Sequence, residues 1–359
     1  MDIFKFSVST GEVSILFHNQ ITVPSIPSSG GIYIVDTNTY PLLQKALGYS
    51  PEAPLVILPC GESEKNFTSI EKILKAALQT SLGRDSLFVG FGGGVVTDMT
   101  AFAASLYMRG ARLELVPTTL LAMADAAVGG KTGIDYENFK NSIGTFYPAD
   151  KIHISISALK TLSETEFRSG LAEVIKTALL YDSELFSIMK EKKEGILARD
   201  PSLLLDIVSR CVIAKARVVE RDLRESGERM FLNLGHTFGH ALESVAGFGR
   251  IPHGDAVAWG IARAFELGIK MNVTDATYKA EVIPVLESYG WSTAPVHPVI
   301  QSDINSGLFD KTKIPQLLLS AMKNDKKKKD GNIRFILQRK MNETLVTEVS
   351  DPKVLEVLL

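Results

Sequence analysis

Cysteine is scarce in this sequence, because Cys60 and Cys211 are the only two among 359 residues. Two cysteines are too few for a disulfide framework or for a zinc site built from thiolates. The chain also has no run of about twenty apolar residues, which excludes a membrane-spanning helix. Its first residues do not combine a basic stretch with an apolar run, so they do not resemble a signal peptide. These absences predict a reduced, cytoplasmic protein with no membrane partner.

An excess of either charge is absent as well. The formal net charge of −2 gives no general reason to expect a nucleic-acid partner. The content of 45% hydrophobic and 22% charged residues is typical of an ordinary globular protein. A chain of 359 residues is long for one hydrophobic core, so we expect two domains.

The N-terminal part of the sequence alternates short apolar runs with helical patterns. Residues 69–83 and 98–110 carry helical patterns. Strands that are apolar throughout and separated by helices predict a buried parallel sheet. We therefore expect a Rossmann-like α/β dinucleotide-binding domain over residues 1–158. Its predicted strands, rich in Val, Ile and Phe, are residues 32–36, 55–59, 86–92 and 113–117.

The C-terminal part shows few strand signals. A short strand pair is expected near residues 331–338, after a lysine run at 326–329 that is typical of a solvated loop. The rest predicts a second, mainly α-helical domain over residues 159–359. Its predicted helices are residues 169–197, 203–223, 235–248 and 256–271.

The glycine-rich stretch "GFGGGVVTD" follows a predicted strand and opens a predicted helix. A nucleotide phosphate could bind backbone N–H groups at such a helix N-terminus. The pattern G-x-G-x-x-G fits Gly92 and Gly94 but meets Thr97 at its third glycine. A tight turn before a helix explains this stretch about equally well.

A second glycine-rich stretch, "VGGKTG", resembles a P-loop. The P-loop pattern requires a glycine where this chain has Asp125, which disfavours a nucleoside triphosphatase. Lys131 follows two glycines, and a partly buried ammonium needs an anion. Lys131 is therefore a candidate for binding a phosphate or a carboxylate.

Three of the six histidines, His236, His240 and His253, lie close together in the sequence. Core histidines would explain one of them, but three buried imidazoles would each need partners. Zinc binds imidazole nitrogen and carboxylate oxygen, and a catalytic site takes three protein ligands. Glu173, in the apolar stretch "GLAEVIKTALL", is the best candidate carboxylate. The helical spacing nominates His236 and His240 but does not decide which histidine is not a ligand.

Seven stretches together resemble successive blocks of the 3-dehydroquinate synthase family, in order, over about residues 55–340. They are "GGGVVTDMTAFAASLYMRG", "VPTTLLAMADAAVGGKTG", "FKNSIGTFYPAD", "GLAEVIKTALL", "ERMFLNLGHTFGHALE", "HGDAV" and "NDKKKKDG". The resemblance implies one active site that converts 3-deoxy-D-arabino-heptulosonate 7-phosphate to 3-dehydroquinate in the shikimate pathway. Bound NAD oxidises an alcohol, phosphate is eliminated, the same cofactor reduces the ketone, and an aldol step closes the ring.

The resemblance also implies a role for each histidine. It assigns Glu173, His236 and His253 to a divalent metal, zinc or alternatively cobalt. It leaves His240 for the substrate and its protons, since an imidazole with a pKa near ~6.5 can accept and return a proton.

Further site residues follow from the resemblance alone. Arg109 resembles a residue that reaches into the neighbouring subunit, which implies a homodimer. The junction of the domains would be lined by Asp125, Lys131, Lys140 and Asn141, and the substrate phosphate would contact Lys131, Asn141 and Lys326. The substrate's carboxylate and hydroxyls would bind Lys215, Arg229 and Asn233. NAD would contact Asp36, Glu62, Lys65, Gly93, Gly94, Asp98, Thr118, Thr119, Lys131, Lys140 and Thr161. The chain departs from the family at Thr97, usually glycine, at Asp255, usually glutamate, and at Met123-Ala124, usually a more polar pair.

Three other functions compete with this interpretation. Another sugar phosphate cyclase, such as a 2-deoxy-scyllo-inosose synthase, takes substrates without the carboxylate, and Arg229, Asn233 and His240 together argue against it. A dehydrogenase of the glycerol dehydrogenase type would release NADH with its product. A non-enzymatic anion-binding or scaffold protein would have no reason to combine three histidines and Glu173 with Lys131 and Arg229.

Overall fold

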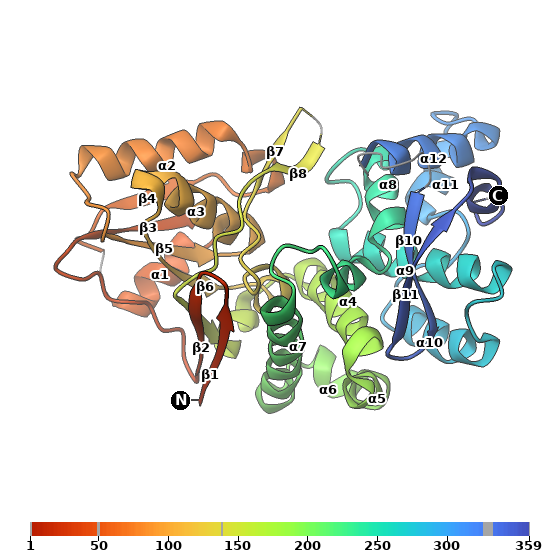
Figure 1. Cartoon of the computed structure of the whole chain (residues 1–359), viewed down its shortest axis with the longest axis horizontal. Helices are drawn as coiled ribbons and strands as arrows, with labels where there is room; N and C mark the ends of the chain where they lie inside the picture. The colour runs from red at the N-terminus through yellow and green to blue at the C-terminus, as the bar shows by residue number, and fades with distance from the viewer. Residues whose placement is uncertain (1, 49–50, 138, 326–332, 359) are drawn as a thin grey trace. The chain divides into compact units, whose positions relative to one another are not determined.

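The computed structural model describes residues 2–48, 51–137, 139–325 and 333–358 (Figure 1). The chain divides into two compact units, and helix α4 (Glu164–Tyr181) contributes to both. The first unit comprises Met1–Gly170 and Gly195–Glu225, and the second comprises Leu171–Glu194 and Ser226–Leu359. Within the described residues, no helix combines the length and apolarity needed to cross a membrane.

A seven-stranded sheet forms the centre of the first unit, in the order β1-β2-β9-β6-β5-β3-β4. The hairpin of β1 and β2 is antiparallel, and the other neighbouring strands are parallel. The four predicted strands are confirmed as β3 to β6, whereas β1, β2 and β9 were not predicted. The strands are β1 (Asp2–Val8), β2 (Gly11–His18), β3 (Gly31–Asp36), β4 (Leu55–Leu58), β5 (Leu87–Gly92), β6 (Arg112–Pro117) and β9 (Lys151–Ser155).

Two longer helices pack against the parallel part of this sheet. α2 (Phe67–Gln79) begins where the Asn66 side chain accepts a hydrogen bond from the Ser69 N–H. α3 (Gly94–Leu106) contacts β3, β5 and β6. It ends at Leu106 rather than at Gly110, because Met108 and Arg109 adopt positive φ angles of 46° and 68° that cannot continue a helix.

The remaining elements of the first unit include helices from later in the chain. α7 (Pro201–Arg221) contacts β1, and the Glu220 carboxylate accepts a hydrogen bond of 3.0 Å from the Ser7 N–H. The sequence placed this helix in the second domain, but its contacts place it in the first unit. The other elements are α1 (Tyr40–Leu47), α6 (Lys193–Leu197), the hairpin of β7 (Ile134–Tyr136) and β8 (Phe139–Ile143), and the short helices η1 (Glu62–Glu64), η2 (Tyr107–Arg109), η3 (Ala122–Ala126) and η4 (Ile156–Thr161).

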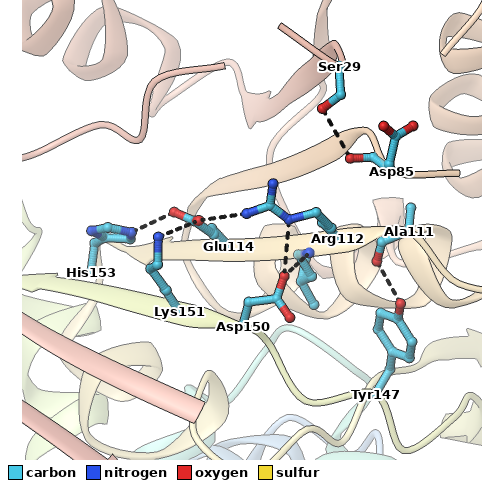
Figure 2. Close-up of polar contacts among 10 residues, drawn as sticks. Ser29, Asp85, Ala111, Arg112, Glu114, Tyr147, Asp150, Lys151 and His153 are labelled. Atoms are coloured by element: carbon cyan, nitrogen blue, oxygen red, sulfur yellow. Dashed lines mark hydrogen bonds and ion pairs between the residues drawn. The ribbon is translucent and has the colours of Figure 1, made fainter. Parts of the chain in front are cut away.

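A buried carboxylate lies within the sheet, on β6 (Figure 2). Glu114 is 3% exposed and accepts a hydrogen bond of 2.8 Å from Nε2 of His153, while Lys151 Nζ lies 3.2 Å from its other oxygen. Burial acts to raise the pKa of Glu114, but His153 and Lys151 outweigh it and hold that pKa below its ordinary value. The acid is therefore ionised inside the sheet and satisfied by its neighbours on β9.

The second unit is mainly helical, as predicted. The predicted helix over residues 169–197 is divided, because Asp182 accepts a hydrogen bond of 2.9 Å from the Leu185 N–H and starts a new helix there. A hairpin of β10 (Ile333–Lys340) and β11 (Glu343–Val349) occurs where a strand pair was expected. The helices after α4 are α5 (Ser183–Glu191), η5 (Glu228–Asn233), α8 (His236–Ala246), α9 (His253–Lys270), α10 (Ala276–Ser288), α11 (Pro298–Asn305), η6 (Lys311–Lys313), α12 (Ile314–Asp325) and α13 (Asp351–Leu355).

Helices α8 and α9 approach one another through glycines. A Cβ atom at Gly260 would lie 2.0 Å from the carbonyl oxygen of Gly235, and one at Gly239 would lie 2.8 Å from that of Ala256. Gly235 also has a φ of +80°, which L-residues with side chains rarely adopt. Glycine at these positions therefore sets how closely the two helices pack.

Candidate metal centre and cofactor site

Three predicted metal ligands converge in the second unit from three helices. Glu173 lies on α4, whereas His236 and His253 are the first residues of α8 and α9. The close approach of α8 and α9 brings the two imidazoles together, with ring centroids 5.5 Å apart. One ligand atom from each of the three residues lies within 4.8 Å of the others.

The spacing of these atoms suits a single metal ion. Oε1 of Glu173 lies 3.6 Å from Nε2 of His236 and 3.3 Å from Nε2 of His253. Two ligands at typical zinc distances and a tetrahedral angle lie about 3.4 Å apart. Two imidazoles and one carboxylate are also the ligand types of a catalytic zinc site that keeps an open position.

The arrangement of polar groups at this centre suits a bound cation. Nδ1 of His236 lies 3.2 Å from the Leu234 carbonyl oxygen, which can only accept, so Nδ1 carries the proton and Nε2 presents a lone pair. That lone pair faces the Glu173 carboxylate, and Glu173 is 1% exposed. Neither carboxylate oxygen of Glu173 has a hydrogen-bond partner among the described residues, although Lys176 forms an ion pair with it. A cation between these acceptors would satisfy both.

The charges at this centre follow from burial and from neighbouring groups. Burial lowers the pKa of His236 to about 3, and the Lys176 ammonium adds to this effect. Burial acts to raise the pKa of Glu173, but Lys176 and His236 outweigh it and hold that pKa well below its ordinary value. Burial also acts to lower the pKa of His253, but Glu173 and Glu243 raise it to about 10. Without metal, His236 is therefore neutral and His253 is protonated.

The third histidine of this sequence segment, His240, lies beside the centre. Its ring centroid is 5.3 Å from that of His236 and 6.2 Å from that of His253. Among the described residues, it forms a possible metal-binding group with Glu243 and His253, not with Glu173 and His236. The H-x-x-x-H pair that the spacing nominated is thus divided between two groups of side chains.

The predicted phosphate-binding turn of the first unit lies between β5 and α3. Gly93 precedes the first residue of α3, so the turn presents the N-terminus of that helix. A Cβ atom at Gly92 would lie 2.6 Å from the Val96 side chain, so glycine is required there. Thr97, which replaces the third glycine of the pattern, is buried and donates a hydrogen bond of 3.0 Å to the Gly94 carbonyl.

A buried lysine, Lys65, joins two other predicted cofactor and substrate residues of the same unit. Lys65 Nζ lies 2.6 Å from Oδ2 of Asp98 and also donates to the side-chain oxygen of Asn141. Burial acts to lower the pKa of Lys65, but Asp98 and Glu62 outweigh it and raise that pKa above its ordinary value. Asn141 has a φ of +51°, and its N–H donates a hydrogen bond of 2.7 Å to Asp135. The lysine is therefore held charged and fixed in place.

Two further predicted substrate residues form ion pairs in the first unit. Lys215 Nζ lies 2.5 Å from both the carbonyl oxygen and Oδ1 of Asp125. Lys131 forms an ion pair with Glu225. Gly130 has a φ of +66°, and a Cβ atom there would lie 2.8 Å from Pro148. Lys131 thus follows a turn that only glycine fits.

The remaining predicted site residues are spread over both units. Asp36 ends β3 and begins a turn, in which its Oδ1 accepts hydrogen bonds from the N–H groups of Asn38 and Thr39. Thr118 is buried, and its N–H donates a hydrogen bond of 2.9 Å to the Gly92 carbonyl. Glu62 and Arg109 are exposed in the first unit, which also contains Thr119, Lys140 and Thr161. The second unit carries Arg229, which is buried, and Asn233, both on η5. Lys326 lies outside the described residues.

Three charged residues at these sites were not predicted from the sequence. Lys176 is 1% exposed and one helical turn after Glu173, so its place in the same apolar stretch was a usable signal. Glu243 follows His240 by three residues and could have been found in the same way. Glu225, the partner of Lys131, carries no such signal, because only the fold brings the two together.

Solved structures with this fold define the class of protein. The 2-epi-5-epi-valiolone synthase of Streptomyces hygroscopicus, with NAD+ and Zn2+ bound, has a TM-score of 0.83 and 25% identity over 96% of this chain and 95% of that chain. A 2-deoxy-scyllo-inosose synthase, complexed with carbaglucose-6-phosphate, NAD+ and Co2+, has a TM-score of 0.82 and 21% identity over 99% of both chains. The chain therefore has the fold of the sugar phosphate cyclases.

Sequence comparison identifies the particular family. Residues 55–169 match the 3-dehydroquinate synthase N-terminal model and residues 170–328 the C-terminal model. The 3-dehydroquinate synthase of Acidithiobacillus ferrooxidans is 38% identical over 96% of this chain and 91% of that protein. The enzyme of a Picosynechococcus species is 40% identical over 88% of this chain and 82% of that protein. The chain belongs to the 3-dehydroquinate synthase family.

These comparisons confirm the predicted fold class, family and enzyme class, a phosphate-eliminating lyase. The predicted cofactors, NAD and Zn2+ or Co2+, agree with those bound in the solved structures.

Proposed function

We propose that the chain converts 3-deoxy-D-arabino-heptulosonate 7-phosphate to 3-dehydroquinate and phosphate, with Glu173, His236 and His253 as the metal ligands. The observation that carries this proposal is the convergence of these two imidazoles and a buried carboxylate at metal-ligand spacing. Without a metal, the Nε2 lone pair of His236 would face the Glu173 carboxylate, and two acceptors cannot satisfy one another.

The bound metal would supply positive charge at a substrate oxygen, and bound NAD would supply a reversible hydride acceptor. Neighbouring residues hold the ligands in the protonation states that bind a metal. Glu173 stays ionised because Lys176 balances its charge, and His236 stays neutral with its Nε2 available. The ligand set is therefore in its binding form at two of three positions before any ion arrives.

His240 would accept and return substrate protons in this proposal. It is partly exposed and belongs to no group of metal ligands with Glu173 and His236. Its imidazole can therefore exchange protons while the ligands stay fixed. Arg229 is buried on η5, and its planar guanidinium suits the two oxygens of the substrate carboxylate. Asn233 and Lys215 would bind substrate hydroxyls.

The first unit would bind the NAD pyrophosphate at the N-terminus of α3, with Gly93 and Gly94 in the turn. Asp98 and Lys65 would contact the cofactor from their buried ion pair. Thr118, Thr119, Lys140, Thr161, Glu62 and Asp36 complete the proposed NAD residues. Lys131, Asn141 and Asp125, together with Lys326, complete the proposed substrate site.

The decisive experiment supplies the phosphorylated seven-carbon acid with catalytic NAD and Zn2+. We expect stoichiometric inorganic phosphate and carbocyclic product, with no net absorbance change from NADH. Faster turnover of a phosphorylated sugar without the carboxylate would instead indicate another sugar phosphate cyclase. Accumulation of NADH in step with product would indicate a dehydrogenase, and the absence of any turnover or bound metal would exclude all three.

We further propose that the chain acts as a cytoplasmic homodimer in which Arg109 reaches the partner's site. Arg109 is exposed on η2, directly after α3, and could therefore contact a second copy. The substrate is a small phosphorylated acid, and neither a nucleic acid nor a membrane is part of this proposal.

A further inference from the structure

His253 has a carboxylate on each side of its imidazole ring. Its Nε2 lies 3.3 Å from Oε1 of Glu173, and its Nδ1 lies 3.6 Å from Oε1 of Glu243. Both carboxylates are buried, at 1% and 3% exposure. The two ring nitrogens therefore face two different buried acids.

The sequence places Glu243 at this position through helix periodicity. His236, His240 and Glu243 are spaced by four and three residues on α8, so their side chains share one face. The glycine contacts between α8 and α9 hold that face close to the start of α9, where His253 lies. The contact between Glu243 and His253 is thus built into the packing of two helices.

Two arrangements could use this contact. In one, Glu243, His240 and His253 would hold a second cation, which their spacing allows. His253 would then have to bind one cation at each nitrogen, although a neutral imidazole offers only one lone pair. In the other, Nδ1–H of His253 donates to Glu243, as metal-bound histidines commonly donate to a carboxylate.

We propose that Glu243 is a positioning residue for the metal centre. It accepts the Nδ1 proton of His253, so the Nε2 lone pair of that ring points to the metal held with Glu173 and His236. This inference rests on the metal centre of the proposed function. Glu243 touches neither the metal nor the substrate and acts only through His253.

The test measures metal binding to the full-length chain, stripped of metal, without an assay of activity. Glu243→Met replaces the acceptor with an apolar side chain of similar length, and Glu243→Gln retains an acceptor oxygen. Glu243→Asp keeps the charge but withdraws it from Nδ1. Glu266→Met on α9 controls for the loss of an acid, since Glu266 pairs with Lys279.

We expect one Zn2+ per wild-type chain, and affinity about 10- to 100-fold weaker in Glu243→Met and Glu243→Asp. Glu243→Gln should bind more tightly than these two, and Glu266→Met should match the wild type. The visible absorption of bound Co2+ should change in Glu243→Met and remain near the wild type in Glu243→Gln. Thermal unfolding of the metal-free proteins shows whether each variant folds. If Glu243→Met does not fold, Glu243→Asp replaces it as the test variant.

The possible outcomes separate the two arrangements. Two Zn2+ per wild-type chain, with only the second lost in Glu243→Met, would establish a second cation site and overturn the positioning role. One Zn2+ with unchanged affinity and Co2+ spectrum in the folded variants would also overturn it, while leaving the proposed function intact. A wild-type chain that binds no metal would instead overturn the metal centre itself.

Discussion

A single proton on His253 controls how the metal centre responds to pH. Glu173 and Glu243 raise the pKa of this imidazole to about 10 in the metal-free chain, against the effect of burial. A metal can bind only the deprotonated nitrogen, so binding at neutral pH must release this proton.

We therefore predict the release of about one proton per Zn2+ bound at pH 8, with affinity rising about tenfold per pH unit up to about pH 10. A pH-indicator dye in weak buffer, or calorimetry in buffers of different ionisation enthalpy, measures this release. Metal binding at pH 8 without proton release would contradict the pKa of His253. The Glu266→Met variant should release the same proton as the wild type.

The neighbouring histidines should respond differently to removal. His236→Ala removes a proposed ligand, so metal and activity should be lost together. His240→Ala should keep one Zn2+ while turnover falls by about 10²- to 10⁴-fold, the usual contribution of a general acid or base. Elemental analysis and phosphate release measure the two effects. Loss of metal in His240→Ala, but not in His253→Ala, would show that the ligand assignment is wrong.

At this scale the sequence indicated the residue types of the centre but not its geometry. The scarcity of histidine made the cluster conspicuous, and the apolar surroundings of Glu173 marked an acid that needs a partner. Helical spacing then paired His236 with His240, because periodicity reports neighbours on one helix only. The resemblance, rather than spacing, supplied His253, whose proximity depends on the packing of α9 against α8.

The packing of helix α9 against α8 requires a glycine at position 260. A Cβ atom at Gly260 would lie 2.0 Å from the Gly235 carbonyl oxygen, which is backbone and cannot rotate away. Gly260→Ala should therefore separate α8 from α9, weaken Zn2+ binding by at least about tenfold and destabilise the chain by about 1–3 kcal/mol.

Zinc titration and urea unfolding of the metal-free protein test this prediction. Gly249→Ala is a stringent comparison, because no atom lies within 4 Å of its added Cβ and only its φ of +84° opposes the change. That variant should lose some stability but keep its zinc affinity. Equal loss of affinity in both variants would show that the helix approach does not position the ligands.

Strand β6 carries the charge of Glu114, whose partners hold its pKa below the ordinary value. Its contribution to stability is therefore present above the unfolded-state pKa, and it is lost as pH falls through the lower folded-state pKa. Glu114→Gln should be about 1–3 kcal/mol less stable at pH 7, because the bonds to His153 and Lys151 lose their charge.

This difference should shrink on acidification, which urea unfolding at pH 7 and near pH 3 can measure. Glu348→Gln offers a control, since that acid forms an exposed ion pair of 3.5 Å with Arg334. A difference for Glu114→Gln that does not change with pH would mean that the charge of Glu114 is not stabilising.

The elements were predicted to different degrees for physical reasons. β3 and β5 lie in the interior of a parallel sheet, so their apolar sequences reveal them. β9 was not predicted because it is short and contains two polar residues, Lys151 and His153, whose side chains bind the Glu114 carboxylate. Helix periodicity predicted the second unit well but ran past Asp182, where a capping side chain divides the helix.

The proposed homodimer makes a prediction for the whole molecule. If Arg109 serves the partner's site, a mixture of Arg109→Ala and Lys131→Ala chains should contain mixed dimers with one intact site. Activity should then exceed the sum of the two variants and approach about a quarter of the wild type when half the dimers are mixed. Phosphate release after unfolding and joint refolding measures this recovery. No recovery, despite mixed dimers shown by differential tagging, would mean that each chain completes its own site.

The pairing of β2 with β9 has a consequence for synthesis. β2 ends at His18, whereas the parallel neighbour that it requires spans Lys151–Ser155. A chain emerging from the ribosome must therefore leave one edge of its first hairpin without that neighbour until most of the first unit has been translated. Such long-range pairing slows folding and leaves a strand edge of this hairpin open to other nascent chains until β9 has been translated.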